Sequence, residues 1–372
     1  MSSALKVACA SIVIAASLSL GAFAKDPGSS ARSSQRSSGV VSIIADSIDS
    51  QSMRFAADLA AVLDGEDGLR ILPIVGRGPV ETVNDILFLK GVDAGIVPSD
   101  VLAYIEGHGI MDGVSNKLSF IAKLGSADLH IIARKEVKSL ADLQGKRVNA
   151  GNVTEPRFIT ASLIFESLGI AVATTSGDEG AAVRQLREGQ ADAIVILAKQ
   201  PSPIVEDLAK SGQFHLLSVP LTPELEKIYA PAMLSSGSYG ALAGQSGVET
   251  ISVSSLLAVF NWRKGSARYS KLRDLASALY SRIGDLQSGE RSTRWSDINF
   301  ASDAPGWTRY VSANEWLAKK KKEPPPEPSA KDISELKAQM TAARGGEFGA
   351  RKVAEDRVTN SGYTTWSRSR LQ

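Results

Sequence analysis

The most constraining feature of this 372-residue sequence is an alternation of strand and helix patterns that occurs twice in series. The first series spans residues 40–100 and reads VVSIIA, SMRFAADLAAVL, LRILPIV, VETVNDILFLKG and VDAGIVPSD. The second begins at LHIIARKE and continues through SLADL, KRVNAG, ITASLIFESLG, AAVRQLREG and ADAIVILA. Such alternation is typical of parallel sheets covered by helices. Because the chain is longer than one core usually fills, we expect an α/β protein with two lobes.

The chain is expected to return to the first lobe after the second series. Residues 248–261, VETISVSSLLAVFN, are strand-like and then helix-like, and residues 270–286, SKLRDLASALYSRIGDL, have helical spacing. We predict that this last helix packs on the first lobe. The predicted division therefore gives residues 39–130 and 240–318 to lobe 1 and residues 131–239 to lobe 2.

The N-terminal segment has the composition of a cleaved export signal. An apolar stretch, Val7 to Leu20, follows a single lysine, and Ala22-Phe23-Ala24 provides the small residues of a cleavage site. We expect a signal peptide over residues 1–24, cleaved after Ala24, and a serine-rich flexible lead-in over residues 25–38. The mature protein is therefore predicted to be periplasmic.

The C-terminal segment differs in charge from the body of the chain. Residues 319–372 contain 12 Lys or Arg and 7 Asp or Glu, and four lysines are followed by four prolines within five residues. Adjacent prolines favour an extended linker. We predict a basic, proline-linked and mostly disordered tail. It could be a solvated spacer, or it could contact a membrane surface, peptidoglycan or an acidic partner.

The residue types that most enzymes and metal sites need are scarce. Cys9, the single cysteine, lies in the predicted signal peptide, so the mature chain has no thiol for disulfides, metal sites or catalysis. His108, His130 and His215 are far apart, without the spacing of metal ligands. We therefore expect no enzyme activity, no metal, no cofactor and no nucleic-acid partner.

Four motifs occur in an order that resembles a known family. They are ILPIVGRGPVETVNDILFLKGVDAGIVPSD, KSLADLQGKRVNAG, REGQADAIVILAKQPSPIVEDLAK and SGSYGALAGQSGVETISVSSLLAV. Together they resemble the TAXI-type substrate-binding proteins of TRAP transporters, over residues 40–290. The resemblance implies a two-lobed, type II periplasmic-binding-protein-like fold with parallel-rich sheets and a ligand cleft between the lobes. It also implies a monomer that binds a small molecule and works with a membrane permease or a sensor partner.

Two loops depart from the pattern of that family. After the first strand the chain has ADSIDSQSMRFA, where a glycine-rich loop with an aromatic residue is usual. After KRVNAG it has NVTEPRF in place of a small glycine-serine loop. These departures leave the identity of the ligand open.

The GRGP loop is the most interpretable part of the expected cleft, because parallel sheets bind ligands beyond the carboxyl ends of their strands. Gly76 and Gly78 let the backbone approach a ligand, and Pro79 suits the first turn of a helix whose free amides attract an anion. Arg77 matches the geometry of a carboxylate. The alternative is that Arg77 pairs with a surface acid or lies in solvent.

A second loop is expected to face the GRGP loop from lobe 2. Gly151 forms its turn, Thr154 is a plausible N-cap, and Pro156 lies in the first helical turn. Gly151, Thr154, Glu155 and Arg157 are candidate ligand contacts. Glu155 brings a negative charge to this helix end, which Arg157 could neutralise; the alternative is that Glu155 only stabilises its own helix.

Carboxylates of the same loops are candidate partners for an ammonium group. Asp46, Asp49, Asp178 and Glu179 would, together with Arg77, suit a zwitterion such as an amino acid. The remaining predicted contacts are Ser47, Ser50, Gln51, Ser99 and Asp100, with Tyr239 as an aromatic cover where the chain crosses back. The alternatives are helix capping by the aspartates and serines, and interlobe packing by Tyr239.

We therefore predict a periplasmic solute-binding protein that captures a small carboxylate-bearing ligand, an amino acid or organic acid, for TRAP-type transport. The alternative is a ligand-sensing or scaffold protein of the same fold, which acts in the export compartment through a partner and its basic tail.

Overall fold

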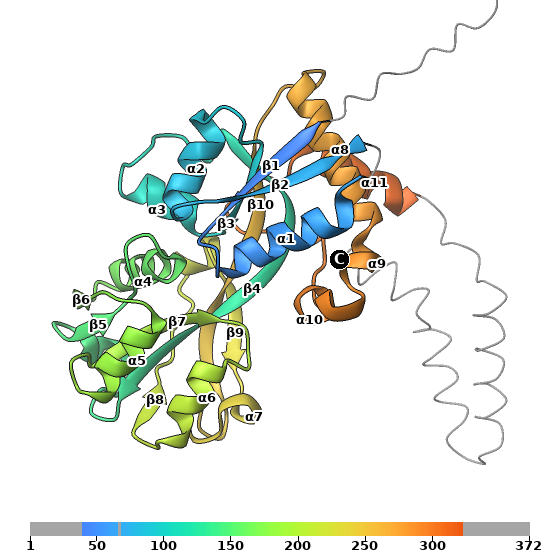
Figure 1. The fold of residues 1–372 in the computed structure, drawn as a ribbon. Coiled ribbons are helices and arrows are strands. Elements are labelled where there is room, and N and C mark those ends of the chain that lie inside the picture. The colour runs from blue at the N-terminus through green and yellow to red at the C-terminus, as the bar shows by residue number, and fades with distance from the viewer. Residues whose placement is uncertain (1–38, 66–67, 323–372) are drawn as a thin grey trace, which may run out of the picture. The chain divides into compact units, whose positions relative to one another are not determined.

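A computed structural model describes residues 39–65 and 68–322 of the chain (Figure 1). These residues form a ten-stranded mixed sheet in the order β2-β1-β3-β10-β4-β7-β5-β6, with β8 paired to β4 and β9 to β10. The predicted signal peptide, the lead-in and the tail from residue 323 onward lie outside the described residues. Within the described part, no helix has both the length and the apolar character needed to cross a membrane.

The first half of the sheet consists of three parallel strands. Strand β1 (Val40–Ala45) lies between β2 (Arg70–Val75) and β3 (Ala94–Pro98). The helices that follow these strands are α1 (Gln51–Leu63), α2 (Pro79–Phe88) and α3 (Val101–Gly107). All five elements predicted for residues 40–100 are thus present, and α2 ends three residues earlier than predicted.

The second half has the same arrangement of three parallel strands. Strand β5 (Arg147–Asn149) lies between β6 (Ala173–Thr175) and β7 (Ala193–Ala198), again in parallel. The helices of this half are η2 (Leu140–Leu143), α4 (Pro156–Ser167), α5 (Glu179–Arg187) and α6 (Pro203–Lys210). In each half the first strand lies between the second and third, so the predicted two-lobed periplasmic-binding-protein fold is confirmed.

Two long antiparallel strands join the halves. Strand β4 (Leu118–Arg134) pairs with β10 (Val248–Phe260) and continues alongside β7, while β10 also pairs with β3. Within the described residues, these strands are the two places where the chain passes from one half to the other. Strand β4 begins before residue 129, where the sequence predicts the second series to start.

The prediction of a helix at the end of residues 248–261 is wrong. Residues 256–259 belong to β10, and all four are buried with zero exposed surface. A strand that is covered on both faces is apolar at successive positions, so it loses the alternation that identifies a strand.

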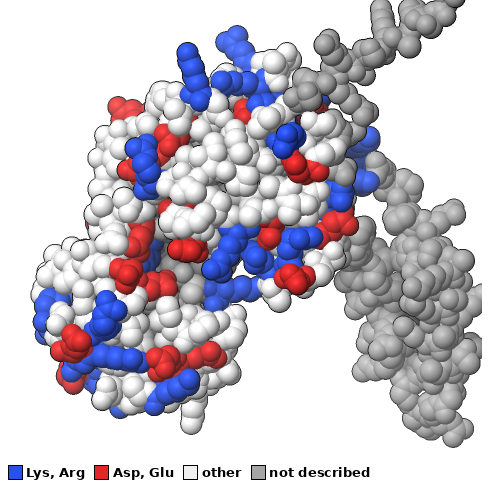
Figure 2. All heavy atoms as spheres, in the orientation of Figure 1, with Lys and Arg blue, Asp and Glu red and all other residues white. Residues whose placement is uncertain are grey.

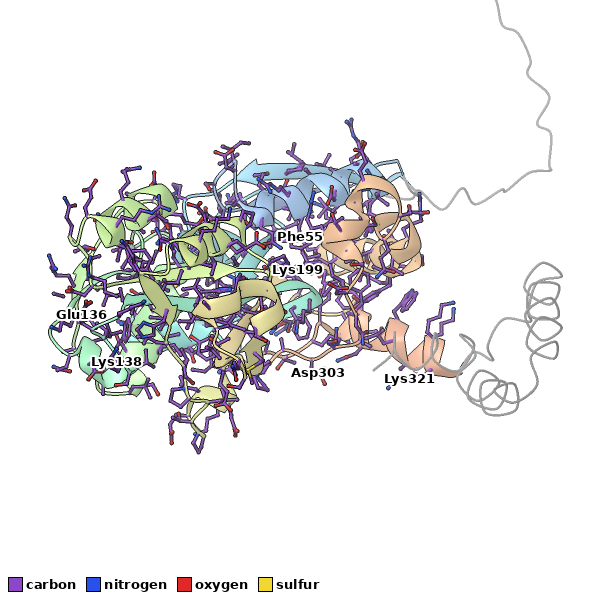
Figure 3. All side chains as sticks on the ribbon, turned by 90° about the horizontal axis from the view of Figure 1, so that it is seen from below. Phe55, Glu136, Lys138, Lys199, Asp303 and Lys321 are labelled. Carbon is purple, nitrogen blue, oxygen red and sulfur yellow. The ribbon has the colours of Figure 1, made fainter. Side chains whose placement is uncertain are left out.

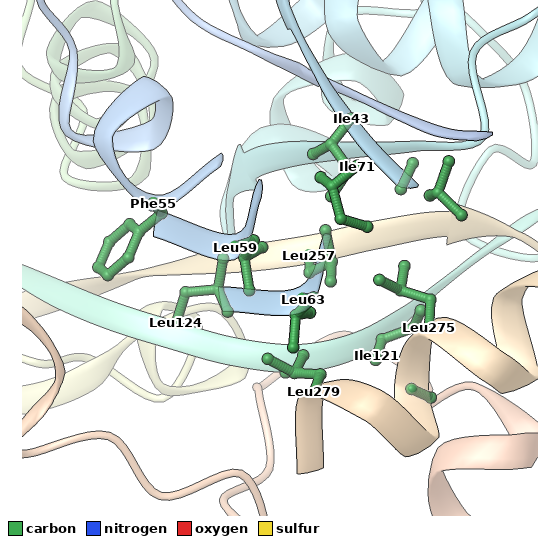
Figure 4. Packing of buried hydrophobic residues seen from close by; sticks show 14 of the residues in the cluster. Ile43, Phe55, Leu59, Leu63, Ile71, Ile121, Leu124, Leu257, Leu275 and Leu279 are labelled. Atoms are coloured by element: carbon green, nitrogen blue, oxygen red, sulfur yellow. The ribbon is translucent and has the colours of Figure 1, made fainter. Parts of the chain in front are cut away.

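Helix α8 (Ala267–Ser281) follows β10 and packs in one cluster with residues of the first half. It ends at Ser281, before the predicted end, and a short helix α9 (Ile283–Leu286) follows. Figure 4 shows Leu275 and Leu279 of α8 packed with α1 and the crossing strands in one buried cluster. Burial of this apolar face stabilises the helix at this site.

Short elements complete the described chain. In the second half and at its end they are β8 (Phe214–Leu216), η3 (Leu225–Lys227), β9 (Ala230–Leu234), α7 (Ser236–Tyr239) and η4 (Gly240–Leu242). After α9 they are η5 (Gly289–Arg291), α10 (Ser292–Trp295) and α11 (Val311–Lys322).

Helix α11 includes the four lysines that the sequence assigns to the tail. Ala313 of this helix is fully buried, and the Trp316 ring lies 5.0 Å from that of Tyr280 on α8. Lysine is a good helix former, so the lysine run continues the helix. The described part of this helix therefore extends to Lys322.

Replacing Leu275 by alanine should lower the free energy of unfolding by about 2–5 kcal/mol, because removing a buried leucine leaves a cavity. Chemical denaturation followed by circular dichroism measures this change. Ser277→Ala is the control, because Ser277 is exposed on the same helix and its replacement should cost less than about 0.5 kcal/mol. An effect no larger than that of the control would contradict the packing of α8 against this core.

Candidate functional site

Loops from the two halves touch at Gly78 and Thr154. Gly78 has φ +133° and precedes α2, and a Cβ atom there would lie 2.7 Å from the carbonyl oxygen of Thr154. Only glycine allows both this conformation and this approach. The GRGP loop and the NVTEP loop therefore face each other, as the sequence predicts.

Gly76 brings the end of β2 against the end of β1. Its amide donates to the carbonyl oxygen of Ala45 at 2.6 Å, and a Cβ atom at Gly76 would lie 2.3 Å from the same oxygen. The next residue after Ala45 is Asp46. The glycine thus packs backbone against backbone beside a candidate ligand-binding residue.

Arg77 lies on the surface with a weak acidic partner. Its Nη2 is 3.6 Å from Asp85 Oδ1, and 71% of its side chain is exposed. Asp85 is itself buried, so this contact differs from the predicted alternative of a pair with a surface acid, while the Arg77 side chain lies largely in solvent. The 3.6 Å separation is longer than a hydrogen bond, so the guanidinium can exchange this partner for a ligand.

Arg157 is a buried structural residue. Its Nε donates to Glu155 Oε2 at 2.7 Å, and its two Nη atoms donate to the carbonyl oxygens of Val195 at 3.1 Å and Gly177 at 2.5 Å. Only 3% of the residue is exposed. The predicted neutralisation of Glu155 is thus present, and the same side chain joins three loops of the second half.

Gly151 allows Arg157 to occupy this position. It has φ +92°, and a Cβ atom would lie 2.7 Å from Arg157 Nε. The predicted N-cap at Thr154 is wrong. Thr154 is exposed and Glu155 is the N-cap, with no side-chain capping bond, because its carboxylate accepts from Arg157 and from Asn152 Nδ2.

Acidic side chains from both halves lie close to one another. Burial raises the pKa of Asp46, and the negative charges of Glu155 and Glu81 raise it further. Burial also raises the pKa of Glu179, against the opposing effect of Arg157. Figure 2 shows acidic side chains where the two halves meet, with Lys and Arg side chains close beside them. This arrangement favours a cationic group and disfavours a second anion.

Sequence reasoning missed Glu81 in this group. It is the acidic residue in the first turn of α2, and its Oε2 would lie 3.1 Å from a Cβ atom at Gly78. An acid in the first turn normally stabilises its own helix, so its position after GRGP was the available signal.

Several predicted contacts instead cap helices or form the turn before α1. Ser50 Oγ accepts from the Met53 amide at 3.1 Å, and Asp178 Oδ1 accepts from the Ala181 amide at 2.6 Å. Ser50 and Asp178 are therefore helix caps in the structure, which is the alternative given for them above. The others lie exposed between β1 and the first turn of α1: Ser47, Asp49 and Gln51.

Ser99 and Asp100 are buried rather than open to a cleft. Ser99 exchanges hydrogen bonds with Ser254 of β10. Asp100 Oδ2 accepts from Thr160 Oγ1 at 2.6 Å and from the Tyr229 hydroxyl at 3.0 Å, and both donors belong to the second half. Asp100 therefore contacts the opposite half directly.

Tyr239 lies apart from the other predicted residues. It is 2% exposed within a cluster of the second half, and its hydroxyl lies 2.8 Å from His130 Nε2 and accepts from the Ser202 amide at 3.0 Å. The prediction placed Tyr239 at the return crossing. The chain crosses later, within β10, so Tyr239 packs inside the second half and does not form interlobe packing.

The fold and the facing loops define a two-lobed α/β protein of the periplasmic-binding-protein class. The chain belongs to the NMT1-like family, whose model matches residues 56–303.

Solved structures with a similar fold include three binding proteins. One is the substrate-binding protein of an amino acid ABC transporter, with 13% identity, coverage of 69% of this chain and 99% of that chain, and a TM-score of 0.41. Another is a TctC solute binding protein from Polaromonas, with 13% identity, coverage of 72% and 91%, and a TM-score of 0.45. The third is the alkanesulfonate-binding protein SsuA from Xanthomonas axonopodis pv. citri bound to MOPS, with 16% identity, coverage of 82% and 91%, and a TM-score of 0.38.

The two arginines of the facing loops should respond differently to replacement by alanine. Arg157→Ala should lower the free energy of unfolding by about 3–5 kcal/mol, because it leaves a partly buried carboxylate and two carbonyl groups without their donor. Arg77→Ala should lower it by about 1 kcal/mol or less, because the Arg77 side chain is exposed and lies 3.6 Å from its acidic partner Asp85. Denaturant titration of both variants measures the difference. Equal effects would contradict the assignment of Arg157 as structural.

Proposed function

We propose that this chain is a periplasmic solute-binding protein that captures a small molecule between its two halves for transport across a membrane. The observation that carries the proposal is the meeting of the Gly78 loop with the Thr154 loop. Both loops follow carboxyl ends of parallel strands, the usual position of ligands in such sheets. Membership of the NMT1-like family is consistent with it.

The charges of the facing loops support a ligand with both a carboxylate and an ammonium group. Arg77 and the free amides at the start of α2 suit the carboxylate. Asp46, Glu81 and Glu155 suit the ammonium group, since their mutual repulsion is relieved by a cation. Of the two predicted ligand classes, the amino acid is therefore favoured over an organic acid without a cationic group.

The partner proposed for transport is a TRAP-type membrane permease. The support is the resemblance of four sequence motifs to TAXI-type substrate-binding proteins, over a region that includes the facing loops. The genes beside the one that encodes this chain give a direct check, because a binding protein and its permease are commonly encoded together.

The ligand can be identified from protein purified without unfolding. Native mass spectrometry should detect a retained small molecule, and thermal-shift measurements should show a higher melting temperature with amino acids than with dicarboxylic acids, because a bound ligand stabilises the folded state. A response to dicarboxylic acids alone would contradict the proposed zwitterion. No response to any small molecule in either measurement would contradict solute binding.

Arg77→Ala should weaken binding of the identified amino acid by about 1.5–3 kcal/mol, or roughly 10–150-fold in Kd. Asp46→Asn should also weaken it, because it removes one of the carboxylates opposite the ammonium group. Isothermal calorimetry measures both. Arg70→Ala is the matched control, because Arg70 is also an exposed arginine of the first half, 3.8 Å from Asp64. A loss of affinity in the control equal to that of Arg77→Ala would point to a general charge effect.

A further inference from the structure

Helices α3 and α4 form a seam between the two halves. Ile159 and Leu163 of α4 pack in one cluster with Val101, Leu102 and Ile105 of α3. Since the backbone joins the halves only through β4 and β10 in the described chain, this seam is held by non-covalent contacts. The seam must separate if the two halves move apart.

The carboxyl group of Asp100 lies at one end of this seam and is fully buried. Its Oδ2 accepts from Thr160 Oγ1 and from the Tyr229 hydroxyl, while its Oδ1 has no hydrogen-bond partner among the described residues. Within the same residues, no lysine, arginine or histidine forms an ion pair with it. A buried carboxylate with one free oxygen and two neutral donors is poorly compensated.

We propose that Asp100 is a proton-controlled latch, whose neutral carboxyl group holds α3 of the first half against α4 and Tyr229 of the second half. Ionisation of this group favours separation of the halves. The cleft proposed above would therefore close more readily at acidic pH. The latch depends on the contacts between the halves and not on a particular solute.

The protonated carboxyl group of Asp100 can form good hydrogen bonds with the same neighbouring residues. A proton on Oδ2 can be donated to Thr160 Oγ1 at 2.6 Å, and the Thr160 hydroxyl can in turn donate to the carbonyl oxygen of Pro156 at 3.3 Å. In the ionised form both hydroxyls turn toward Oδ2, and Oδ1 shares the charge without a donor. The closed arrangement thus binds a proton more tightly than an arrangement in which water reaches the carboxylate.

The direction of the pKa change agrees with this geometry. Burial raises the pKa of Asp100 from 3.8 to about 6, and the hydrogen bonds from Thr160 and Tyr229 offset part of the effect. A raised carboxyl pKa means that closure is favoured most below the ordinary pKa and that this preference is lost as pH rises through about 6. The difference in pKa corresponds to about 100-fold in the ratio of closed to open protein.

Other titratable groups also lie near the seam and the proposed cleft. Their protonation either acts in the opposite direction to that of Asp100 or affects other contacts. On α4, Glu155 pairs with Arg157 and Glu166 with His108 of the first half. On α3, Glu106 accepts from the Ser115 amide. Repulsion between Asp46 and Glu155 is also relieved by protonation, because the pKa of Asp46 is raised.

The Lys199–Asp297 pair acts in the opposite direction (Lys199 is labelled in Figure 3). The two charged groups lie 2.5 Å apart, and they come from the second half and from the chain after α10. Its hydrogen bond to Lys199 lowers the pKa of Asp297, so this contact is lost as pH falls. Both side chains are about half or more exposed, so its contribution is small.

The latch can be tested with the full chain and without any solute. Cysteines placed at the exposed positions Lys90 and Glu188 carry a fluorescence energy-transfer pair, after replacement of Cys9, the single cysteine, by serine. The distance between the labels is followed from pH 4.5 to 7.5. The wild-type distance should increase with pH, with most of the change below about pH 6.5.

Asp100→Asn is the central variant, because asparagine keeps the shape of aspartate and stays neutral. It should hold the short distance at every pH and remove most of the pH response. His108→Gln and Asp46→Asn, which remove two of the other titratable groups named above, should each keep most of it. A wild-type distance that does not change with pH, or an Asp100→Asn response equal to that of wild type, would overturn the proposal.

Two further variants keep the test decisive if Asp100→Asn does not fold. Thr160→Val and Tyr229→Phe each remove one hydroxyl that stabilises the ionised carboxylate, so the midpoint of the response should move to higher pH. Asp93→Asn is the control, because Asp93 is a buried aspartate of the first half whose partner is Lys271. An unchanged midpoint in both hydroxyl variants, or an equal shift in the control, would reject the latch.

Discussion

The pairing of β4 with β10 is the constraint on which the rest of the structure depends. The two strands pair from Leu118 and Phe260 at one end to Asp128 and Ser252 at the other, with irregularities beside Leu256 and Ala258. Each strand belongs to both halves. The antiparallel pair of β4 and β10 therefore determines where the parallel strands of each half end relative to those of the other. The loops at those ends face each other because of this shared pair of strands, and contacts such as the α3–α4 seam then determine how closely they approach.

The polar residues between the halves divide into structural and exposed groups. Arg157 and Asp100 are both buried, but Arg157 has four hydrogen-bonding partners while Asp100 has only two hydroxyl donors. Arg77 remains exposed, and the acids around Asp46 are only partly screened from one another. A ligand with both charges would find an arginine and acidic groups on the same pair of loops. The two buried residues have other roles: Arg157 holds together loops of the second half, and Asp100 contacts the second half from the first.

The sequence predicted most of the first half and part of the second, where β6 and α6 were not predicted. The alternation of apolar runs with helical patterns predicted β1 to β3, α1 and α2 within a few residues, because local periodicity and loop residues agree there, but it did not predict α3. The sequence did not predict that residues 256–259 form a strand, since burial on both faces removes the alternation. It also did not predict that the lysine run belongs to α11, since nothing local separates a helix end from a linker that begins with lysines.

For the candidate site, the sequence by itself determined which loops follow the strands and where glycine is required. Gly76, Gly78 and Gly151 were predicted on that basis, and each permits a close approach that a Cβ atom would prevent. The tertiary structure alone decided the role of each charged side chain. Arg77 and Arg157 follow similar glycine loops, yet one is exposed and the other buried, because burial depends on residues such as Val195 and Gly177 that lie far away in the chain. Asp100 likewise became a contact between the halves only when folding brought Thr160 and Tyr229 to its carboxyl group.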